Sequence, residues 1–169
     1  MTRPTIIVRT RRPRVDASSL AAAAEALARR AETLARRRGT TLPEGGVDVL
    51  LVCPAASRAA HRAVNGAEGA TDVITAPYAA TPVCPARAEL IVCPAVAIRA
   101  AARRDDSTLL PEERGIPWSA DLELALYIAH GLDHLAGSDD STEREYREMR
   151  LRELRWIASA LPNPPKFFV

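Results

Sequence analysis

The sequence predicts an α/β fold, because apolar runs of strand length alternate along the chain with segments of helical periodicity. The predicted strands comprise residues 5–9, 47–52, 73–76 and 89–93. The predicted helices comprise residues 18–38, 54–64, 95–104 and 120–136, together with a last helix that ends near residue 161. A chain of 169 residues is close to the usual domain size and can bury a sizeable core, so we expect one domain over residues 1–169.

The N-terminal half begins with a strand at residues 5–9 and continues with a long helix at residues 18–38, in which leucines recur every seven residues. Gly39 closes this helix, and the arginines of its last turn suit the negative end of the helix dipole. The apolar run at residues 47–52 is the next strand. Pro54 then stands at a first-turn position, where proline is favoured, and starts the following helix.

The second half contains two further strands, at residues 73–76 and 89–93, which a proline-containing loop connects. A helix at residues 95–104 follows. Residues 105–118 carry prolines and a glycine among charged residues, which indicates a loop. Because this loop directly precedes the next helix, it is either a flap over a site on that helix or a plain solvated connector.

Residues 120–136 are predicted to form a helix that Ser119 caps. Apolar residues recur on this helix at helical spacing and give it a face for the core, namely Leu124, Ile128, Leu132 and Leu135. Ser141 or Thr142 caps the last helix, and prolines after Leu161 end it. The Phe-Phe-Val end of the chain is either disordered or a small docking patch.

Composition and charge narrow the class of protein. The formal net charge is only +2, so the protein as a whole is not a polycation that would bind nucleic acid. Local clusters of arginine can still bind along a phosphate backbone. Cys53, Cys84 and Cys93 match no zinc or redox spacing, and we expect buried, reduced thiols near strand ends. No segment has a signal peptide's apolar region or the ~20 apolar residues of a membrane span, so we expect a cytoplasmic protein and no membrane partner.

A short motif at the end of the predicted helix 120–136 indicates a metal site. His130 and His134 stand four residues apart, so their rings lie on one face of the helix and can reach one ion. Gly137 can end the helix in the left-handed conformation and turn the chain back. That turn brings a carboxylate within reach of the same ion, with Asp140 as the best-placed third ligand and Asp139 as the alternative.

Several segments together resemble the YbeY family of endoribonucleases, which act in ribosomal RNA maturation. The resemblance rests on the histidine run and on two upstream segments, residues 69–77 and 88–94, and it extends from about Val47 to Leu161. The family motif is His-Gly-x-x-His-Leu-x-Gly-x-Asp-His. This chain keeps every fixed position of that motif except the last, where Asp140 replaces the third histidine.

The resemblance, together with the strand and helix pattern, implies a small, mixed and mostly parallel sheet packed by helices, with the metal-bearing helix near the centre, in a metzincin-like arrangement. It implies a zinc-dependent endoribonuclease with one Zn²⁺ per chain, although another divalent ion is possible. The implied partners are single-stranded or ribosomal RNA, with ribosomal proteins or the small subunit as further candidates, and no DNA.

The resemblance also implies roles for residues outside the histidine motif. Asn65 falls where the family usually has an arginine that helps catalysis, and Arg62, one helical turn earlier, is the candidate to compensate. Glu123 matches a family glutamate and shares a helix stripe with His130. It is either the acceptor of a ring proton from a metal-bound imidazole or a plain surface glutamate.

The chemistry that we expect is hydrolysis of a phosphodiester by metal-activated water. Three ligands leave one position open, and a bound divalent ion lowers the pKa of water there to near neutral. Arginines can neutralise charge on the phosphate, with Arg58, Arg62, Arg87 and Arg99 as candidates.

Two alternatives remain open from the sequence. One is a metzincin-like peptidase, but Gly131 stands where such enzymes carry their general-base glutamate. The other is a non-catalytic member that binds RNA or the ribosome.

Overall fold

The fold was obtained as a computed structural model, which describes residues 4–105, 107 and 109–169. Its centre is a four-stranded sheet with the strand order β1-β2-β4-β3. The strands are β1 (Thr5–Val8), β2 (Val47–Leu51), β3 (Val73–Tyr78) and β4 (Arg87–Val92). β1, β2 and β4 are parallel, whereas β3 pairs antiparallel with β4 at the edge of the sheet. The sheet is therefore mixed and mostly parallel, as the sequence predicts.

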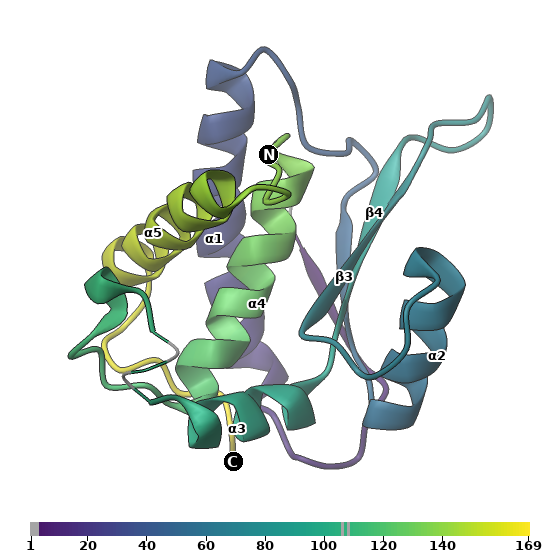
Figure 1. Ribbon diagram of the computed structural model, residues 1–169. Helices are drawn as coiled ribbons and strands as arrows, with labels where there is room; N and C mark the ends of the chain where they lie inside the picture. The colour runs from purple at the N-terminus through teal and green to yellow at the C-terminus, as the bar shows by residue number, and fades with distance from the viewer. Residues whose placement is uncertain (1–3, 106, 108) are drawn as a thin grey trace.

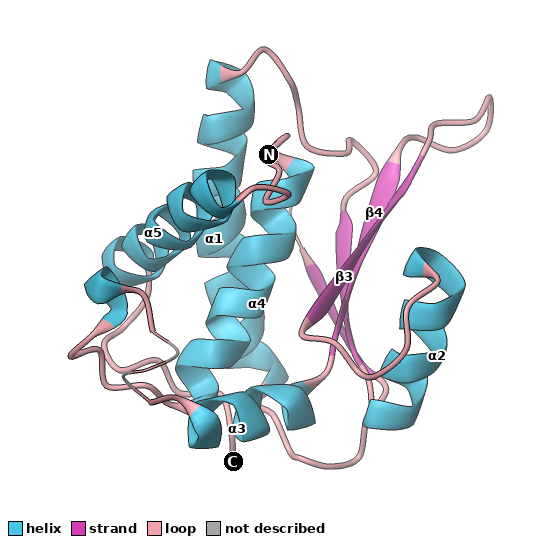
Figure 2. Cartoon of the chain, in the orientation of Figure 1, coloured by secondary structure: helices cyan, strands magenta, loops and turns pink. Residues whose placement is uncertain are grey.

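The helices cover both faces of this sheet. They are α1 (Ala17–Arg37), α2 (Pro54–Asn65), α3 (Pro94–Arg103), α4 (Ala120–Leu135) and α5 (Glu143–Ala160), with a short 3₁₀ turn at Pro111–Glu113. In Figure 1, α1, α4 and α5 lie on one side of the strands and α2 lies on the other. Figure 2 shows that long loops connect these elements at both ends of the sheet. No helix of the described chain is both long and apolar enough to cross a lipid bilayer.

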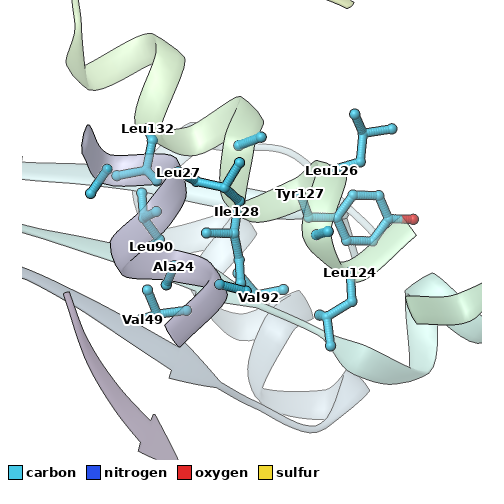
Figure 3. Close-up of a cluster of buried hydrophobic side chains, with 14 of the residues drawn as sticks. Ala24, Leu27, Val49, Leu90, Val92, Leu124, Leu126, Tyr127, Ile128 and Leu132 are labelled. Atoms are coloured by element: carbon cyan, nitrogen blue, oxygen red, sulfur yellow. The ribbon is translucent and has the colours of Figure 1, made fainter. Parts of the chain in front are cut away.

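α4 lies at the centre of the hydrophobic core. Its side chains from Leu122 to Ala129 are all buried. Figure 3 shows Ile128 and Leu132 of this helix beside Leu27 of α1 and Leu90 of the sheet. A helix that is apolar around most of its circumference is stable only when other elements surround it. Burial of each leucine or isoleucine stabilises the fold by about 1.5–3 kcal/mol, so this helix is a rigid support for the residues at its C-terminal end.

Gly131 lets α4 approach the sheet closely. A Cβ atom added to Gly131 would lie 2.7 Å from Cδ2 of Leu90 and 3.2 Å from Cγ2 of Val73. Real side chains essentially never make contacts as short as the first of these. The missing side chain therefore lets the helix turn that carries His130 and His134 lie beside β3 and β4.

The strand and helix ends differ in detail from those predicted. β3 extends to Tyr78 and includes Pro77, which the sequence places in a loop, because an edge strand tolerates a residue without an N–H donor. Thr142, rather than Ser141, caps α5, and Glu145 completes a capping box with it. Cys84 is exposed, contrary to expectation, because it lies in the connection between β3 and β4.

The C-terminal tail packs against the rest of the chain. Phe167 is buried, and the backbone N–H groups of Phe167 and Phe168 both donate to Oδ1 of Asp121 in the first turn of α4. The carbonyl of Phe167 accepts from the N–H of Asp16, which caps α1. Of the two states that the sequence leaves open for this tail, the structure therefore shows the docked one.

Candidate metal centre

Three side chains converge where α4 ends. Nε2 of His130 lies 3.1 Å from Nε2 of His134, and the carboxylate of Asp140 lies 3.5 Å from the first ring and 3.8 Å from the second. In a tetrahedral zinc site with bonds of about 2.0–2.1 Å, ligand atoms lie about 3.3 Å apart. Among the His, Cys, Asp and Glu side chains of the described residues, these three lie close enough together to hold one ion.

The local backbone produces this convergence. The two histidines are one helical turn apart on α4, and Gly137 follows with a φ of 86°. The N–H of Gly137 donates to the carbonyl of His134, and the N–H of Ser138 donates to the carbonyl of Asp133. These bonds turn the chain back over the helix end, which brings Asp140 to the histidines as the motif predicts.

Each histidine ring is fixed by a hydrogen bond at Nδ1, the ring nitrogen that does not face the centre. Nδ1 of His134 lies 3.1 Å from the carbonyl oxygen of Ser138, which can only accept, so the ring proton is on Nδ1. Nδ1 of His130 lies 2.7 Å from Oε1 of Glu153, a carboxylate buried on α5. When both rings are neutral, their Nε2 atoms carry the lone pairs, and these face the centre.

This donor set fits a cation. Two imidazole lone pairs and a carboxylate oxygen point to one place, and they repel each other unless a positive charge lies between them. The pKa of His130 responds to the same surroundings: burial lowers it, but the hydrogen bond and charge of Glu153, with Asp72 and Asp140, raise it above its ordinary value. A metal ion that bound here would compete with a proton for the nitrogen atoms of the two rings.

Asp139 has a different set of partners from Asp140. One Oδ atom of Asp139 accepts from the N–H of Asp140 at 2.8 Å, and the other accepts from the hydroxyl of Ser141 at 3.0 Å. The Ser141 hydroxyl and the Asp140 N–H hold the pKa of Asp139 below its usual range. The geometry therefore favours Asp140 over Asp139 as the third candidate ligand.

A buried polar network fixes the turn that carries Asp140. The carboxylate of Asp133 accepts from Arg152 at 2.8 and 3.2 Å and from the hydroxyl of Ser138. The Ser138 hydroxyl also meets Arg38 at 2.6 Å and Arg152 at 3.0 Å. Because Asp133 is fully buried, this network ties three helices to the turn and limits its movement.

The candidate centre opens into a cleft with a volume of about 460 Å³. The cleft is lined by Asn65, Val73, Ile74, Thr75, Pro77, His130, His134 and Leu135. Asn65 therefore lines the same cleft as the two histidines, and its role stays a prediction. Arg62 is not among these residues, because its guanidinium is paired with Glu68 at 2.8 and 2.9 Å in an exposed ion pair.

Glu123 is neither a surface residue nor a partner of His130. It is fully buried, and its carboxylate accepts from Arg104 at 2.5 and 3.2 Å. Arg104 also stacks 4.1 Å from the ring centre of Trp118. The expected role as acceptor for the His130 ring belongs to Glu153 instead, since the carboxylate of Glu123 is committed to a buried ion pair.

Sequence reasoning missed Glu153, although one signal pointed to it. Met149, Glu153, Trp156 and Ile157 form the buried face of α5. A glutamate on such a face needs a partner in the core, because an unpaired buried carboxylate is strongly destabilising. The partner could not be named from the sequence, since His130 belongs to another helix.

The other candidate arginines lie away from the cleft lining. Arg87 forms an ion pair with Asp48 at 2.5 Å, on β4 and β2. Arg58 and Arg99 are exposed on α2 and α3. Asp72, by contrast, accepts from the Thr71 hydroxyl and the Val73 N–H, both at 2.8 Å, and so fixes the start of β3 beside the cleft.

Comparison with known proteins gives a family and a fold. The family model described as "Endoribonuclease YbeY" matches residues 6–160. Among solved structures, the solution structure of TM1509 from Thermotoga maritima is similar with a TM-score of 0.50 and 20% sequence identity, over 93% of this chain and 88% of that one. At this identity the likeness shows a shared fold. No curated protein matches the chain in sequence.

Proposed function

Because this chain belongs to the YbeY family of endoribonucleases, we propose that it is a metal-dependent hydrolase that cuts single-stranded RNA during ribosomal RNA maturation. The observation that carries the proposal is the convergence of His130, His134 and Asp140 at the end of α4, beside an open cleft. We propose that the whole chain acts as one hydrolase domain in the cytoplasm.

The proposed ligands are Nε2 of both histidines and one oxygen of Asp140. A divalent ion held there, with zinc as first choice, would act as a Lewis acid and would lower the pKa of a water molecule toward neutral pH. Because the protein would supply only three ligands, the open side of the centre would remain accessible to water or to the substrate. Asp140 makes the centre one charge less positive than three histidines, which favours harder ions more than the family's usual ligand set does.

Glu153 and Ser138 prepare the two rings for this role. By accepting the Nδ1 protons, they keep both Nε2 lone pairs directed at the centre. The negative charge of Glu153 also raises the basicity of His130 and so strengthens it as a ligand. Glu153 in turn lies 3.8 Å from the guanidinium of Arg150, which also lies 3.4 Å from the buried Glu113 and donates to the hydroxyl of Tyr146.

Phosphate handling is the weak point of the proposed nuclease. Asn65 lines the cleft and can donate hydrogen bonds from its amide, but it has no charge to offset that of a phosphate. Arg62 must leave Glu68 before it can reach the substrate, and an exposed ion pair of this kind is worth about 0–1 kcal/mol. We propose that Asn65 positions the scissile phosphate and that Arg62 contributes when substrate is bound.

The peptidase alternative loses support from the packing of Gly131. Such a peptidase carries its general-base glutamate at the position of Gly131. The Cβ atom of a glutamate there would collide with Leu90. Peptide hydrolysis at this centre therefore lacks a base in the position that such peptidases use.

The test of the proposal is cleavage of a labelled single-stranded RNA, with casein as the competing substrate. We expect RNA to be cut and casein to remain intact, and we expect His130→Gln to abolish the cutting. His61→Gln is the matched control, because His61 lies on α2 and its ring meets the carbonyl of Gly69. Proteolysis that a chelator stops would favour the peptidase, and RNA binding without cleavage would favour a non-catalytic role.

A further inference from the structure

A cluster of arginines lies at the edge of the sheet where the parallel strands β1, β2 and β4 end. Arg9 follows β1 directly, and its N–H donates to the carbonyl of Leu51 at the end of β2. Arg11, Arg12 and Arg14 follow in the loop that leads to α1. All four side chains are exposed. We call this surface the carboxyl edge.

The helices α2 and α3 add to the positive charge of the carboxyl edge. They begin immediately after β2 and β4, and Figure 1 shows their first turns at the same end of the sheet as the loop that follows β1. Arg58 and Arg99 are exposed in the first two turns of these helices. Neither helix has an acidic residue in its first turn, so the positive ends of both helix dipoles are unopposed there.

The arginines of the carboxyl edge are not neutralised within the described part of the chain. Among the residues that the structure describes, no ion pair or side-chain hydrogen bond involves the guanidinium groups of Arg9, Arg11, Arg12, Arg14, Arg58 or Arg99. The neighbouring carboxylate of Asp16 is occupied by the N–H groups of Ser18 and Ser19 and by the Ser19 hydroxyl. The whole chain has a formal net charge of only +2, so this is a local concentration of charge.

A phosphate backbone is the partner that suits such a surface. Arginine binds phosphate through its planar fork, and several such contacts release counterions from a polyanion. The position fits as well, because ligands of open α/β sheets bind beyond the carboxyl ends of the strands, where successive helices go to opposite faces. Here α3 packs against α4, whereas α2 packs against the other side of the sheet.

The carboxyl edge is separate from the metal cleft. The tail residue Val169 donates to the carbonyl of Arg14, and Phe168 beside it is bonded to Asp121 in the first turn of α4. The N-terminal end of α4 therefore lies near the arginine loop. His130 and His134 are nine and thirteen residues farther along this helix than Asp121, which is roughly 14–20 Å at 1.5 Å per residue.

We propose that the carboxyl edge binds the phosphate backbone of structured RNA outside the nucleotides that enter the metal cleft. This inference rests on the proposed function, since it assigns the edge to the same substrate. The protein then holds a long RNA at two places, and only the cleft contacts the bond that is cut. Short single strands use the cleft alone.

The test compares two double variants with the same change in charge. Arg11→Ala with Arg12→Ala removes part of the carboxyl edge, whereas Arg114→Ala with Arg155→Ala removes two exposed arginines from the loop before α4 and from α5. Binding of an RNA hairpin with a single-stranded flank is measured by fluorescence anisotropy over a range of salt concentrations, in chelator so that no cleavage occurs.

We expect the edge variant to raise Kd about tenfold or more and to reduce the slope of log K against log salt by about 1.4–1.8, for two lost phosphate contacts. The control variant should keep the parental slope and affinity. Equal slopes and affinities for both variants overturn the proposal. The proposal is also overturned if the edge variant loses binding to phosphatidylserine vesicles while its RNA binding stays parental. That result would assign the edge to a membrane surface.

A second measurement separates this inference from the proposed function. A dinucleotide has a single phosphodiester, which is the bond that the cleft would cut, so it has no second phosphate for the edge. With metal present, the edge variant should cut it at the parental rate while cutting the hairpin more slowly. If the parent cuts neither RNA, the proposed function fails, and the anisotropy result still decides whether the edge binds RNA.

Discussion

Glu153 on α5 accepts the ring proton of His130 on α4, with 2.7 Å between Oε1 and Nδ1 and a side chain that is only 1% exposed. A buried carboxylate in this position fixes the tautomer of a histidine ligand and increases its basicity. The relationship joins the two helices at the candidate centre, and it leads to the first prediction.

Glu153→Gln should weaken the affinity for a divalent ion by about 10–100-fold, because the amide keeps the shape of the side chain but loses its charge. The measurement is a competition titration of Zn²⁺ or Co²⁺ against a chelator of known affinity. Glu148→Gln is the matched control, since Glu148 lies on the same helix in an exposed pair with Arg144. Equal affinities in the two variants would show that Glu153 has no effect on the ion.

Removal of each neighbouring carboxylate should identify the third ligand. Asp140→Ala should lose most of the bound metal, because it leaves only two nitrogen ligands, whereas Asp139→Ala should retain it. Metal content of the purified variants, determined by elemental analysis, decides between them. The opposite order would exchange the roles of the two residues.

Restoring a positive charge in the cleft should raise activity. Charge-assisted phosphate contacts are worth roughly 1.5–3 kcal/mol, so Asn65→Arg should increase RNA cleavage about tenfold to a hundredfold. Asn163→Arg, which adds the same charge after α5, should leave the rate unchanged. Arg62→Ala should lower the rate by less than Asn65→Arg raises it, because Arg62 is already held by Glu68.

The phosphate assignment depends on both variants. Parental rates for Asn65→Arg and Arg62→Ala, with unchanged metal content, would show that other residues hold the phosphate.

Glu123 should matter for stability rather than for the metal. Breaking a buried ion pair costs about 3–5 kcal/mol, and the loss for Glu123→Gln should be somewhat smaller because Arg104 is partly exposed. Urea denaturation should therefore show a lower free energy of unfolding, while the metal content of the folded variant remains parental. A variant with parental stability that lacks metal would show instead that Glu123 contributes to metal binding.

The parts of the molecule that local sequence determines were predictable. The spacing of His130 and His134, with the left-handed Gly137 after them, predicts the turn that brings in Asp140, and the structure confirms that the three side chains converge. The order of strands and helices was also readable, since apolar runs of strand length and helix-cap residues are local signals. That these side chains bind a metal stays a prediction.

The parts that depend on tertiary contacts were not predictable from spacing. Glu153 and His130 are separated by a turn and most of a helix, and Glu123 and Arg104 meet only because α3 packs on α4. The pairing of Arg62 with Glu68 likewise depends on the path of the loop after α2. Each of these residues has several possible charged partners in the sequence, and only the folded chain determines which of them is near.

The central claim is that one ion, held by His130, His134 and Asp140, enables the protein to cut RNA. Its most direct test is to strip the protein with chelator and measure the rate of single-stranded RNA cleavage as zinc is added back in fractions of an equivalent. We expect no cleavage at the start and a rate that rises until one ion per chain is bound. Cleavage that continues in the stripped protein, or none in the protein loaded with one ion, would contradict the claim.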